Sequence, residues 1–241
     1  MRLTNTVCLV GGAAYGISAI GDCNVYLIDG RNEYALVDAG AGLGVSRILA
    51  NVEELGLDIE KLKTLFLTHS HFDHIGGAHE VQEKLGCKTL AHKDDAEAMK
   101  ALGENVLMDM AKQRGITFEA PRIDRKLSGN EVIKIGDIDI KVINTPGHTP
   151  GCISLSLTER DGKKAILTGD IASTNGRLGF INGPGFDLNA WKASIKKLLN
   201  EKPDRLYPGH NTFMLGNAIE DLKVTDQKMN APWTTIVTAV G

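Results

Sequence analysis

The stretch Thr68-His69-Ser70-His71-Phe72-Asp73-His74 places three imidazoles and a carboxylate within six consecutive residues. It follows the apolar run Thr64-Leu65-Phe66-Leu67, so a strand would end where the polar residues begin. Imidazole nitrogens and carboxylate oxygens are the usual ligands of zinc and of neighbouring first-row metals. His69 and His71 can converge on one ion, whereas the Asp-His pair that follows points differently and could serve a second. The stretch therefore predicts a metal site carried by a loop.

Three further residues of the same types stand where strand-like runs end in glycine or proline. They are His148 in Thr145-Pro146-Gly147-His148-Thr149-Pro150-Gly151, Asp170 after Ala165-Ile166-Leu167-Thr168-Gly169, and His210 closing Leu206-Tyr207-Pro208-Gly209-His210. Taken singly, each is more often a turn or capping residue than a ligand. Together with the first stretch, they predict one metal site assembled from four strand ends.

This pattern resembles the metallo-β-lactamase superfamily, whose hallmark is H-x-H-x-D-H followed by a distant His, Asp and His. The resemblance covers most of the chain, from Asn24-Val25-Tyr26-Leu27-Ile28 and Leu36-Val37-Asp38-Ala39-Gly40 to Pro208-Gly209-His210. It implies a first metal site of His69, His71 and His148, a second of Asp73, His74 and His210, and Asp170 bridging the two ions. Asp38 matches a family aspartate that supports the metal loop from behind the ligands. A carboxylate that caps the turn before Gly40 is an equally good interpretation of Asp38.

The resemblance implies two divalent metal ions as cofactors, with zinc expected first and iron and manganese as alternatives, because all three accept these ligands. Two adjacent ions would lower the pKa of a bridging water from about 15.7 towards about 7, giving a hydroxide that attacks a carbonyl carbon. In this scheme Asp73 would orient the hydroxide and is the expected catalytic residue.

Among the branches of the superfamily, the all-His/Asp ligand set resembles glyoxalase II (hydroxyacylglutathione hydrolase) and the small lactonases. The expected function is therefore a dinuclear metal-dependent hydrolase that cleaves a small ester or thioester. Two alternatives stay open: a lactonase of the acyl-homoserine-lactone type, and a mononuclear iron persulfide dioxygenase. No cysteine fits the second metal site as it does in the zinc β-lactamases, which counts against antibiotic hydrolysis.

Composition predicts a compact enzyme with a small-molecule substrate. The 241 residues show no linker or internal repeat, so we expect one domain over 1–241, and 42% apolar residues are enough for a sizeable core. A net charge of −3 argues against nucleic-acid binding, which requires a clustered basic face. No apolar run reaches the roughly 18–20 residues of a membrane span. The sequence leaves open whether the protein is a homodimer.

The cysteines and the N-terminus bear on the cellular compartment. Cys8, Cys23, Cys87 and Cys152 share no C-x-x-C spacing and are expected to be buried thiols of a reducing, cytoplasmic environment, with a Cys8–Cys23 bridge as the alternative. The segment from Val7 to Ile20 imitates a signal peptide, but its glycines interrupt the apolar core, so we expect it to belong to the mature protein.

The coarse pattern predicts an α+β fold, an αβ/βα sandwich of two mixed sheets packed face to face with helices outside. Strands are expected at about 5–10, 24–29, 34–38, 64–68, 88–91, 131–135, 138–143, 153–157, 164–168 and 205–207. Helices are expected at about 44–56, 75–86, 93–114, 187–200 and 214–228.

Two segments outside the motifs are candidates for substrate selection. Residues 93–120 form an expected helical insertion near the active site, whose Met and Leu side chains could build an apolar wall over the metals. An ordinary amphipathic helix that covers the sheet is the somewhat better interpretation. Residues 171–186 follow a predicted ligand directly and should border the pocket, where Arg177 could meet a substrate carboxylate or could simply be solvated.

Overall fold

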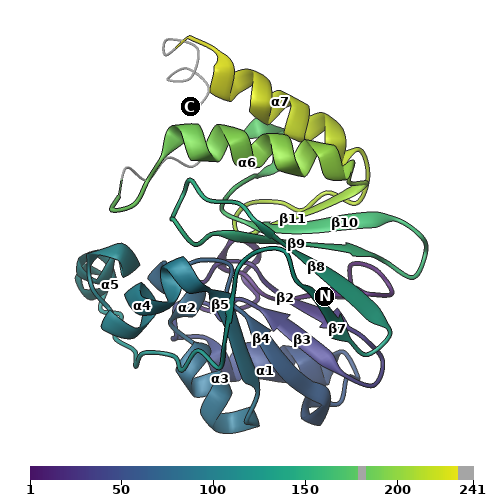
Figure 1. Cartoon of the computed structure of the whole chain (residues 1–241). Helices are drawn as coiled ribbons and strands as arrows, with labels where there is room; N and C mark the ends of the chain where they lie inside the picture. The colour runs from purple at the N-terminus through teal and green to yellow at the C-terminus, as the bar shows by residue number, and fades with distance from the viewer. Residues whose placement is uncertain (179–182, 233–241) are drawn as a thin grey trace.

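The computed structural model describes residues 1–178 and 183–232, and it arranges eleven strands in two sheets that lie between helices (Figure 1). The first sheet follows the chain in the order β1 (Val7–Gly11), β2 (Val25–Asp29), β3 (Tyr34–Val37), β4 (Leu62–Phe66), β5 (Lys88–His92) and β6 (Arg125–Leu127). The first three strands pair antiparallel, and β3 to β6 pair parallel. Because β3 to β6 are parallel, their carboxyl ends lie along one edge of the sheet.

The second sheet has the order β11 (Arg205–Pro208), β10 (Lys164–Gly169), β9 (Ile153–Thr158), β8 (Ile138–Asn144) and β7 (Val132–Ile135). The strands β7 to β10 form antiparallel hairpins, whereas β11 pairs parallel to β10 after a helical crossover. Both sheets are therefore mixed, as the sequence predicted.

Helices cover the outer face of each sheet. Figure 1 shows α1 (Val45–Glu54) and α3 (Ala78–Leu85) against the first sheet, and α6 (Leu188–Glu201) and α7 (Ala218–Asn230) stacked over the second. The remaining helices are α2 (Phe72–Ile75), α4 (Lys93–Ala101) and α5 (Met108–Gln113), with single 3₁₀ turns at Ala13–Tyr15, Ile59–Lys61, Glu104–Val106 and Thr174–Gly176. The expected αβ/βα sandwich is confirmed.

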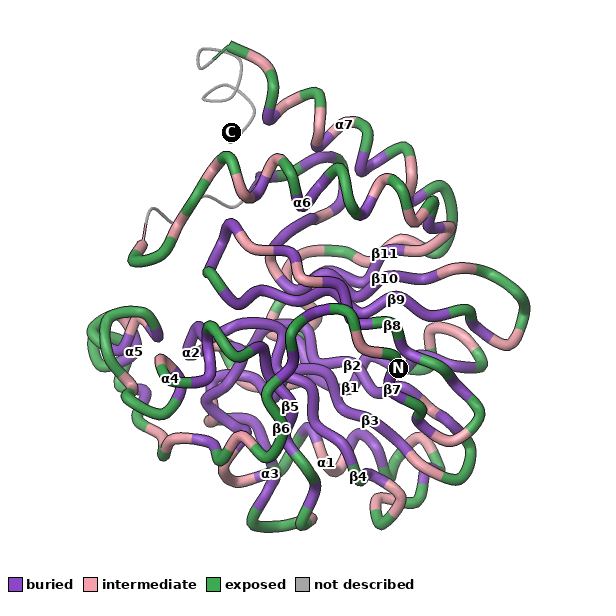
Figure 2. The backbone as a smooth tube through the Cα atoms, viewed as in Figure 1, coloured by how far each residue is buried: buried purple, intermediate pink, exposed green. Residues whose placement is uncertain are grey.

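Three apolar layers hold the sandwich together, and strand alternation separates them. In β1, Val7 and Leu9 join the layer between the two sheets, whereas Cys8 and Val10 join the layer under α1 and α3. A third layer, which includes Trp191, lies between the second sheet and the helices α6 and α7. Figure 2 shows the result, with buried residues along the strands and exposed residues on the outer sides of the helices. The side-chain period of two is what lets each strand contribute to two cores at once.

The expected helix over 93–114 is wrong, because the chain breaks twice within it. α4 ends at Ala101, where Leu102 takes a left-handed conformation with φ 50°, and Leu107 does the same with φ 61° before α5 begins. Left-handed backbone is unfavourable for a branched residue, so the turn is fixed by packing rather than by local preference. Sequence periodicity cannot register such a break.

Other element boundaries differ from the expected ones for identifiable reasons. The last helix begins at Ala218 and not at 214, because Met214 exchanges two backbone hydrogen bonds with Leu206. The helix expected over 75–86 is confined to α3, since the chain first forms the short α2. The three-residue strand β6 was missed, being too short to show a period.

Two of the three methionines of the 93–120 segment lie in the core, and the third, Met110, is partly buried against it. Met99 is fully buried and Met108 is 8% exposed, and both belong to the layer under the first sheet. Met99 and Met108 therefore pack against the sheet, as the better of the two interpretations above expects. These two residues cannot form part of an apolar wall over the metals.

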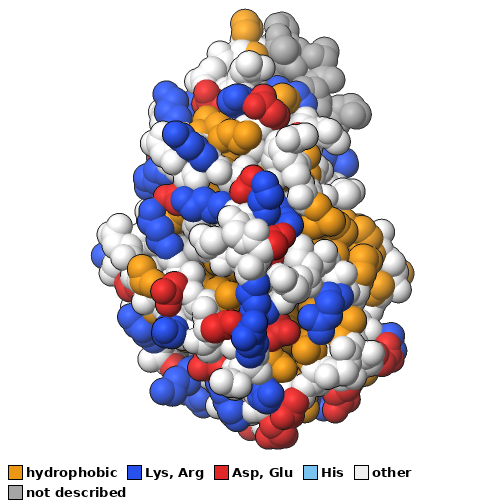
Figure 3. Space-filling model, turned by 90° about the vertical axis from the view of Figure 1, so that its right-hand side faces the viewer, with side chains coloured by type: hydrophobic (Ala, Val, Ile, Leu, Met, Phe, Trp, Pro, Cys, Tyr) orange, Lys and Arg blue, Asp and Glu red, His pale blue; other side chains and the backbone are white. Residues whose placement is uncertain are grey.

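The surface and the cysteines complete the description. On the face drawn in Figure 3, basic and acidic side chains alternate and no patch of a single charge forms.

All four cysteines are free and buried, so the alternative Cys8–Cys23 bridge is not formed. Within residues 1–178 and 183–232, every helix is too short or too polar to cross a membrane.

Candidate metal centre

The seven predicted ligands meet at one edge of the sandwich, where strands of both sheets end. His69, His71, Asp73 and His74 lie on the loop after β4 and on α2. His148 lies on the loop after β8, Asp170 directly after β10, and His210 two residues after the end of β11. Residues up to 141 positions apart in the sequence are thus brought into one cluster, since 210 − 69 = 141. Their role as ligands stays a prediction, but their convergence is a feature of the structure.

One group of donors is the predicted first site. The ligand atoms of His69, His71 and His148 lie within 4.8 Å of one another, and all three residues are buried. His71 Nδ1 and His148 Nε2 are 3.0 Å apart, and the three rings stand nearly perpendicular to one another, at interplanar angles of 74–78°. Three nitrogens that face a common point from different directions suit a tetrahedral ion with one open position.

A second group is the predicted second site. Asp73, His74 and His210 again place one donor atom each within 4.8 Å of the others. The Nε2 atoms of His74 and His210 are 3.3 Å apart. Asp73 Oδ2 lies 3.1 Å from His210 Nε2 and 3.8 Å from His74 Nε2.

Asp170 lies between the two groups. Its Oδ2 is 3.4 Å from His148 Nε2 in the first group and 3.5 Å from His210 Nε2 in the second, while Oδ1 is 3.3 Å from His74 Nε2. One carboxylate therefore reaches both sets of donors. This is the placement that the bridging role predicted for Asp170 requires.

The electrostatics favour cation binding. Burial holds the pKa of His69 well below its usual value, and burial together with His148 lowers the pKa of His71 to about 3. Burial also lowers the pKa of His148. Burial alone would raise the pKa of Asp170, but the neighbouring His210 and His74 hold it well below its usual value. The first group thus offers neutral imidazoles with free lone pairs, beside an ionised carboxylate.

Several buried polar atoms of the cluster make no hydrogen bond. Among the described residues these include His69 Nε2, His148 Nδ1 and Asp170 Oδ1. Leaving a buried donor or acceptor unsatisfied costs about 1–3 kcal/mol, so such atoms call for an explanation. A divalent ion would satisfy His69 Nε2 and Asp170 Oδ1, and the donor set is of the right chemistry for one. The residues present therefore fit a metal.

Asp38 fixes the orientation of the loop. It is buried with φ 63°, and its carboxylate accepts hydrogen bonds from the Thr68 amide and hydroxyl, each at 2.8 Å, and lies 2.8 Å from His74 Nδ1. With Nδ1 bonded to Asp38, Nε2 of His74 is left for a metal. The Thr68 hydroxyl lies 3.1 Å from His69 Nδ1, which extends the same control to a second imidazole. These contacts show that Asp38 supports the metal loop and does not only cap a turn.

The sequence did not reveal what anchors the His210 loop. Asn24 donates from its side chain to the carbonyl oxygens of Pro208 and Asn211, and Tyr26 donates to Pro208 as well. Gly209 is needed at this point, because an added Cβ would stand 2.5 Å from Asp170 Oδ1 and 2.7 Å from His74 Cε1. A polar residue at the head of a strand is too common to identify such an anchor in advance.

The cluster opens to solvent on the side of His210. The His210 side chain is 42% exposed, against 18% for Asp73 and 0% for His69. Beside it lies a small cavity of about 60 Å³, lined in part by Asp170, Ser173, Arg177 and Asn211. Arg177 donates to Asn211 Oδ1 at 3.1 Å. The expectation that residues 171–186 border the site is confirmed for Ser173 and Arg177, which line this cavity. Residues 179–182 of the same segment lie outside the described residues.

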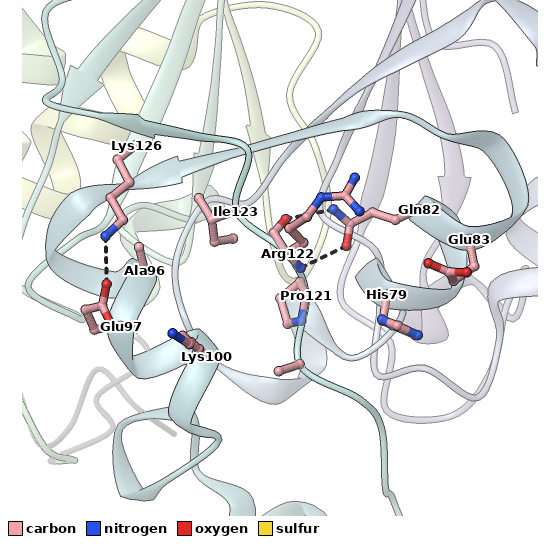
Figure 4. A pocket seen from close by; sticks show the side chains of 11 residues that line it. His79, Gln82, Glu83, Ala96, Glu97, Lys100, Pro121, Arg122, Ile123 and Lys126 are labelled. Carbon is pink, nitrogen blue, oxygen red and sulfur yellow. Dashed lines mark hydrogen bonds and ion pairs between the residues drawn. The ribbon is translucent and has the colours of Figure 1, made fainter.

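A larger pocket lies elsewhere. It lies between α3, α4 and the chain entering β6, and Figure 4 shows residues that line it, such as His79, Glu97 and Arg122. Its volume is about 490 Å³. None of the seven cluster residues lines it. This pocket is larger than the opening beside His210, but it lacks the converging donor atoms of the cluster, so the smaller opening is the better candidate for catalysis.

Cys23, Asp38 and His74 also lie close enough to suggest a metal group. Asp38 is already used by Thr68 and His74, and burial raises the pKa of the Cys23 thiol to about 12. A protonated thiol is a poor metal ligand. This group is therefore support for His74 rather than a separate site.

Comparisons with known proteins agree with these features. The family model of the metallo-beta-lactamase superfamily matches residues 19–210. The hydroxyacylglutathione hydrolase GloC of Haemophilus influenzae is 28% identical over 200 residues, covering 80% of this chain and 86% of its own. A probable metallo-hydrolase of Bacillus subtilis, YqgX, is 28% identical over 207 residues, with 86% and 90% covered.

Solved structures support the fold. BJP-1, a subclass B3 metallo-beta-lactamase of Bradyrhizobium japonicum, superposes with a TM-score of 0.76 at 20% identity, covering 100% of this chain and 96% of its own. FEZ-1 metallo-beta-lactamase from Legionella gormanii gives 0.75 at 20% identity, with 99% and 95% covered. At such identities the likeness concerns the fold alone.

Proposed function

This chain belongs to the metallo-beta-lactamase superfamily, and on that premise we propose that it is a dinuclear metal-dependent hydrolase of small thioesters or esters. One observation carries the proposal. Two groups of three His or Asp residues each place their donor atoms within 4.8 Å of one another, and the Asp170 carboxylate lies close to donors of both groups. The similarity to a hydroxyacylglutathione hydrolase over most of both chains supports the thioester as the bond that is cleaved.

The residues of the chain have separable tasks in this reaction. His69, His71 and His148 would hold one divalent ion, Asp73, His74 and His210 the other, and Asp170 both. When bound, the ions would supply Lewis acidity and lower the pKa of water towards about 7. Asp73, ionised and 18% exposed, is placed to accept a hydrogen bond from the attacking water and to aim it. No separate nucleophilic side chain is needed.

The open side of the cluster is where a substrate would enter. His210 is the most exposed of the seven cluster residues, and the cavity beside it is lined in part by Ser173 and Arg177, which offer a hydroxyl and a guanidinium. These groups suit the polar part of an acyl substrate.

The test combines metal content with two substrates. We expect two metal ions per chain and hydrolysis of S-lactoylglutathione. His148→Ala should lose the hydrolysis and one of the two ions, whereas His79→Ala, which changes a histidine outside the cluster, should retain both ions and the activity. Cleavage of an acyl-homoserine lactone with no thioester cleavage would replace the thioesterase proposal by the lactonase. One iron per chain with neither activity would overturn the hydrolase and indicate persulfide oxidation.

A further inference from the structure

A buried carboxylate lies behind the first group of histidines. Asp95 stands in the first turn of α4 and is 1% exposed. Its Oδ2 accepts from the Thr149 hydroxyl at 2.6 Å, and its Oδ1 accepts from the Gly151 amide at 2.7 Å. Thr149 follows His148 directly in the chain. Asp95 therefore binds the His148 loop through two short hydrogen bonds, although it is 53 positions away, since 148 − 95 = 53.

The other ligand loop is held by the segment that follows α4. Burial raises the pKa of Asp95, and the hydrogen bonds from Thr149 and Gly151 oppose that rise. Ser70 stands between the predicted ligands His69 and His71. Its hydroxyl donates to the Asn105 carbonyl at 3.0 Å, so the segment after α4 holds this loop as well.

Helix α4 separates these contacts from the pocket of Figure 4. Ala96, Glu97 and Lys100 line that pocket, and Glu97 pairs there with Lys126 at 2.6 Å. Met99 packs into the core. Asp95 is thus the residue of α4 whose carboxylate is bonded to the His148 loop, and its neighbour Asp94 is half exposed, at 50% for the side chain.

The fit between Asp95 and Gly151 leaves no room for adjustment. A Cβ added to Gly151 would stand 2.6 Å from Asp95 Cγ and 2.6 Å from its backbone nitrogen. The loop therefore lies directly on the start of the helix. The loop that carries His148 therefore contacts Asp95 through two hydrogen bonds and through direct packing.

We propose that Asp95 is a positioning residue of the metal centre, which fixes the His148 loop on the start of α4 and so sets the affinity of the His69–His71–His148 site. The inference rests on the proposed function, because it assumes that these histidines hold a metal. The two buried carboxylates behind the centre then have different roles. Asp38 orients His74 and, through Thr68, His69, whereas Asp95 holds the loop that carries His148.

The experiment measures the affinity of the protein for each of the two zinc ions separately. Zinc is titrated into metal-free protein against a chromophoric chelator, for the wild type and for Asp95→Asn. Asparagine keeps the shape of the side chain but has one acceptor oxygen, so it cannot accept from both the Gly151 amide and the Thr149 hydroxyl as the carboxylate does. We expect one of the two zinc ions to bind about 10–100-fold more weakly, as for other groups that support metal ligands from behind. The other zinc ion should bind as in the wild type.

Two further variants keep the result decisive. Asp94→Asn, on the same turn and pointing to solvent, should bind both ions as the wild type does. Thr149→Val keeps its shape but removes the hydroxyl donor, and it should weaken the same zinc ion as Asp95→Asn; it answers the question if Asp95→Asn does not fold.

The outcomes separate this inference from the proposed function. If the wild type binds two ions and neither Asp95→Asn nor Thr149→Val weakens one of them selectively, the positioning role is wrong and the metal centre stands. If the wild type binds no metal, the proposed function fails and the inference fails with it.

Discussion

At the scale of single residues, Asp38 shows how the centre is built from behind. One carboxylate accepts two hydrogen bonds from Thr68 and faces His74 Nδ1 at 2.8 Å. Its left-handed backbone is unusual for a residue other than glycine, and this conformation allows the side chain to turn under the metal loop. The strain is offset by hydrogen bonds that a carboxylate can accept in several directions at once.

Replacing this carboxylate should uncouple His74 from its support. In Asp38→Asn the amide cannot accept all three hydrogen bonds, so His74 loses its fixed tautomer. We expect metal affinity to fall about 10–100-fold. Zinc competition titration measures the change, with Asp139→Asn on the exposed side of β8 as the matched control. Wild-type affinity in Asp38→Asn would show that the tautomer is fixed by other means.

Gly209 is a residue whose lack of a side chain matters. A methyl group there would overlap Asp170 Oδ1 at 2.5 Å and His74 Cε1 at 2.7 Å. Gly209→Ala should therefore displace donors of both metal groups and abolish activity, while the protein still folds. Gly103→Ala, where an added Cβ meets nothing within 4 Å, is the control. Activity and metal content are measured together, and a fully active Gly209→Ala would refute the crowding argument.

At the scale of elements, the short connections matter more than the strands. The chain entering β6 is tied to β5 by Asp124, which accepts from the Thr89 amide at 2.9 Å and from Arg122 Nε at 2.7 Å. The hydrogen bond from Arg122 is the main cause of the lowered pKa of Asp124. Because β6 is an edge strand of only three residues, such side-chain bonds contribute much of its attachment.

This tie predicts a pH-dependent stability. A carboxyl whose pKa is lower in the folded state stabilises the protein above its unfolded pKa of about 3.9, and that contribution is lost as the pH falls through the folded pKa. Asp124→Asn should lower the free energy of unfolding at pH 7 by about 0.5–1 kcal/mol, since the pair is partly exposed. The difference from the wild type should shrink as the pH drops below about 4. Urea unfolding at several pH values measures it.

The control for this prediction is Asp109→Asn, which removes an exposed carboxylate from α5. It should leave the free energy of unfolding unchanged at pH 7 and at low pH. A constant difference between Asp124→Asn and the wild type across this range would mean that the carboxylate is not the source of the stabilisation.

At the scale of the whole molecule, the metal centre joins the two sheets. His69, His71, Asp73 and His74 come from the first sheet, and His148, Asp170 and His210 come from the second. Ions bound by both halves would bind the folded protein and not the unfolded chain. Such binding stabilises the folded state by an amount that grows with the logarithm of the ligand concentration once this exceeds the dissociation constant.

Metal removal should therefore destabilise the entire sandwich. Adding zinc to metal-free protein at a free concentration about 100 times its dissociation constant should raise the free energy of unfolding by about 2.7 kcal/mol for each ion bound. Calorimetry should show the full zinc-dependent increase in the free energy of unfolding for the wild type and for His79→Ala. For His148→Ala this increase should be smaller. Equal zinc stabilisation in His148→Ala would place the ion away from His148.

The sequence by itself determined the candidate ligands, because chemistry restricts metal donors to few residue types and the chain sets them after strand-like runs. It also determined the sandwich, because periods of two and of 3.6 distinguish strands from helices without tertiary information. It placed Asp38 near the metal loop but left its role open between support and capping.

Only the tertiary structure decided the rest, and for a physical reason. The breaks at Leu102 and Leu107, the pairing of Met214 with Leu206, and the burial of Met99 all depend on packing between segments distant in sequence. The same holds for the supports of the metal centre. Asp95 and Asn24 look like ordinary residues at the start of a helix and a strand, and it is the approach of the 148–151 and 208–211 loops that gives their polar atoms a partner.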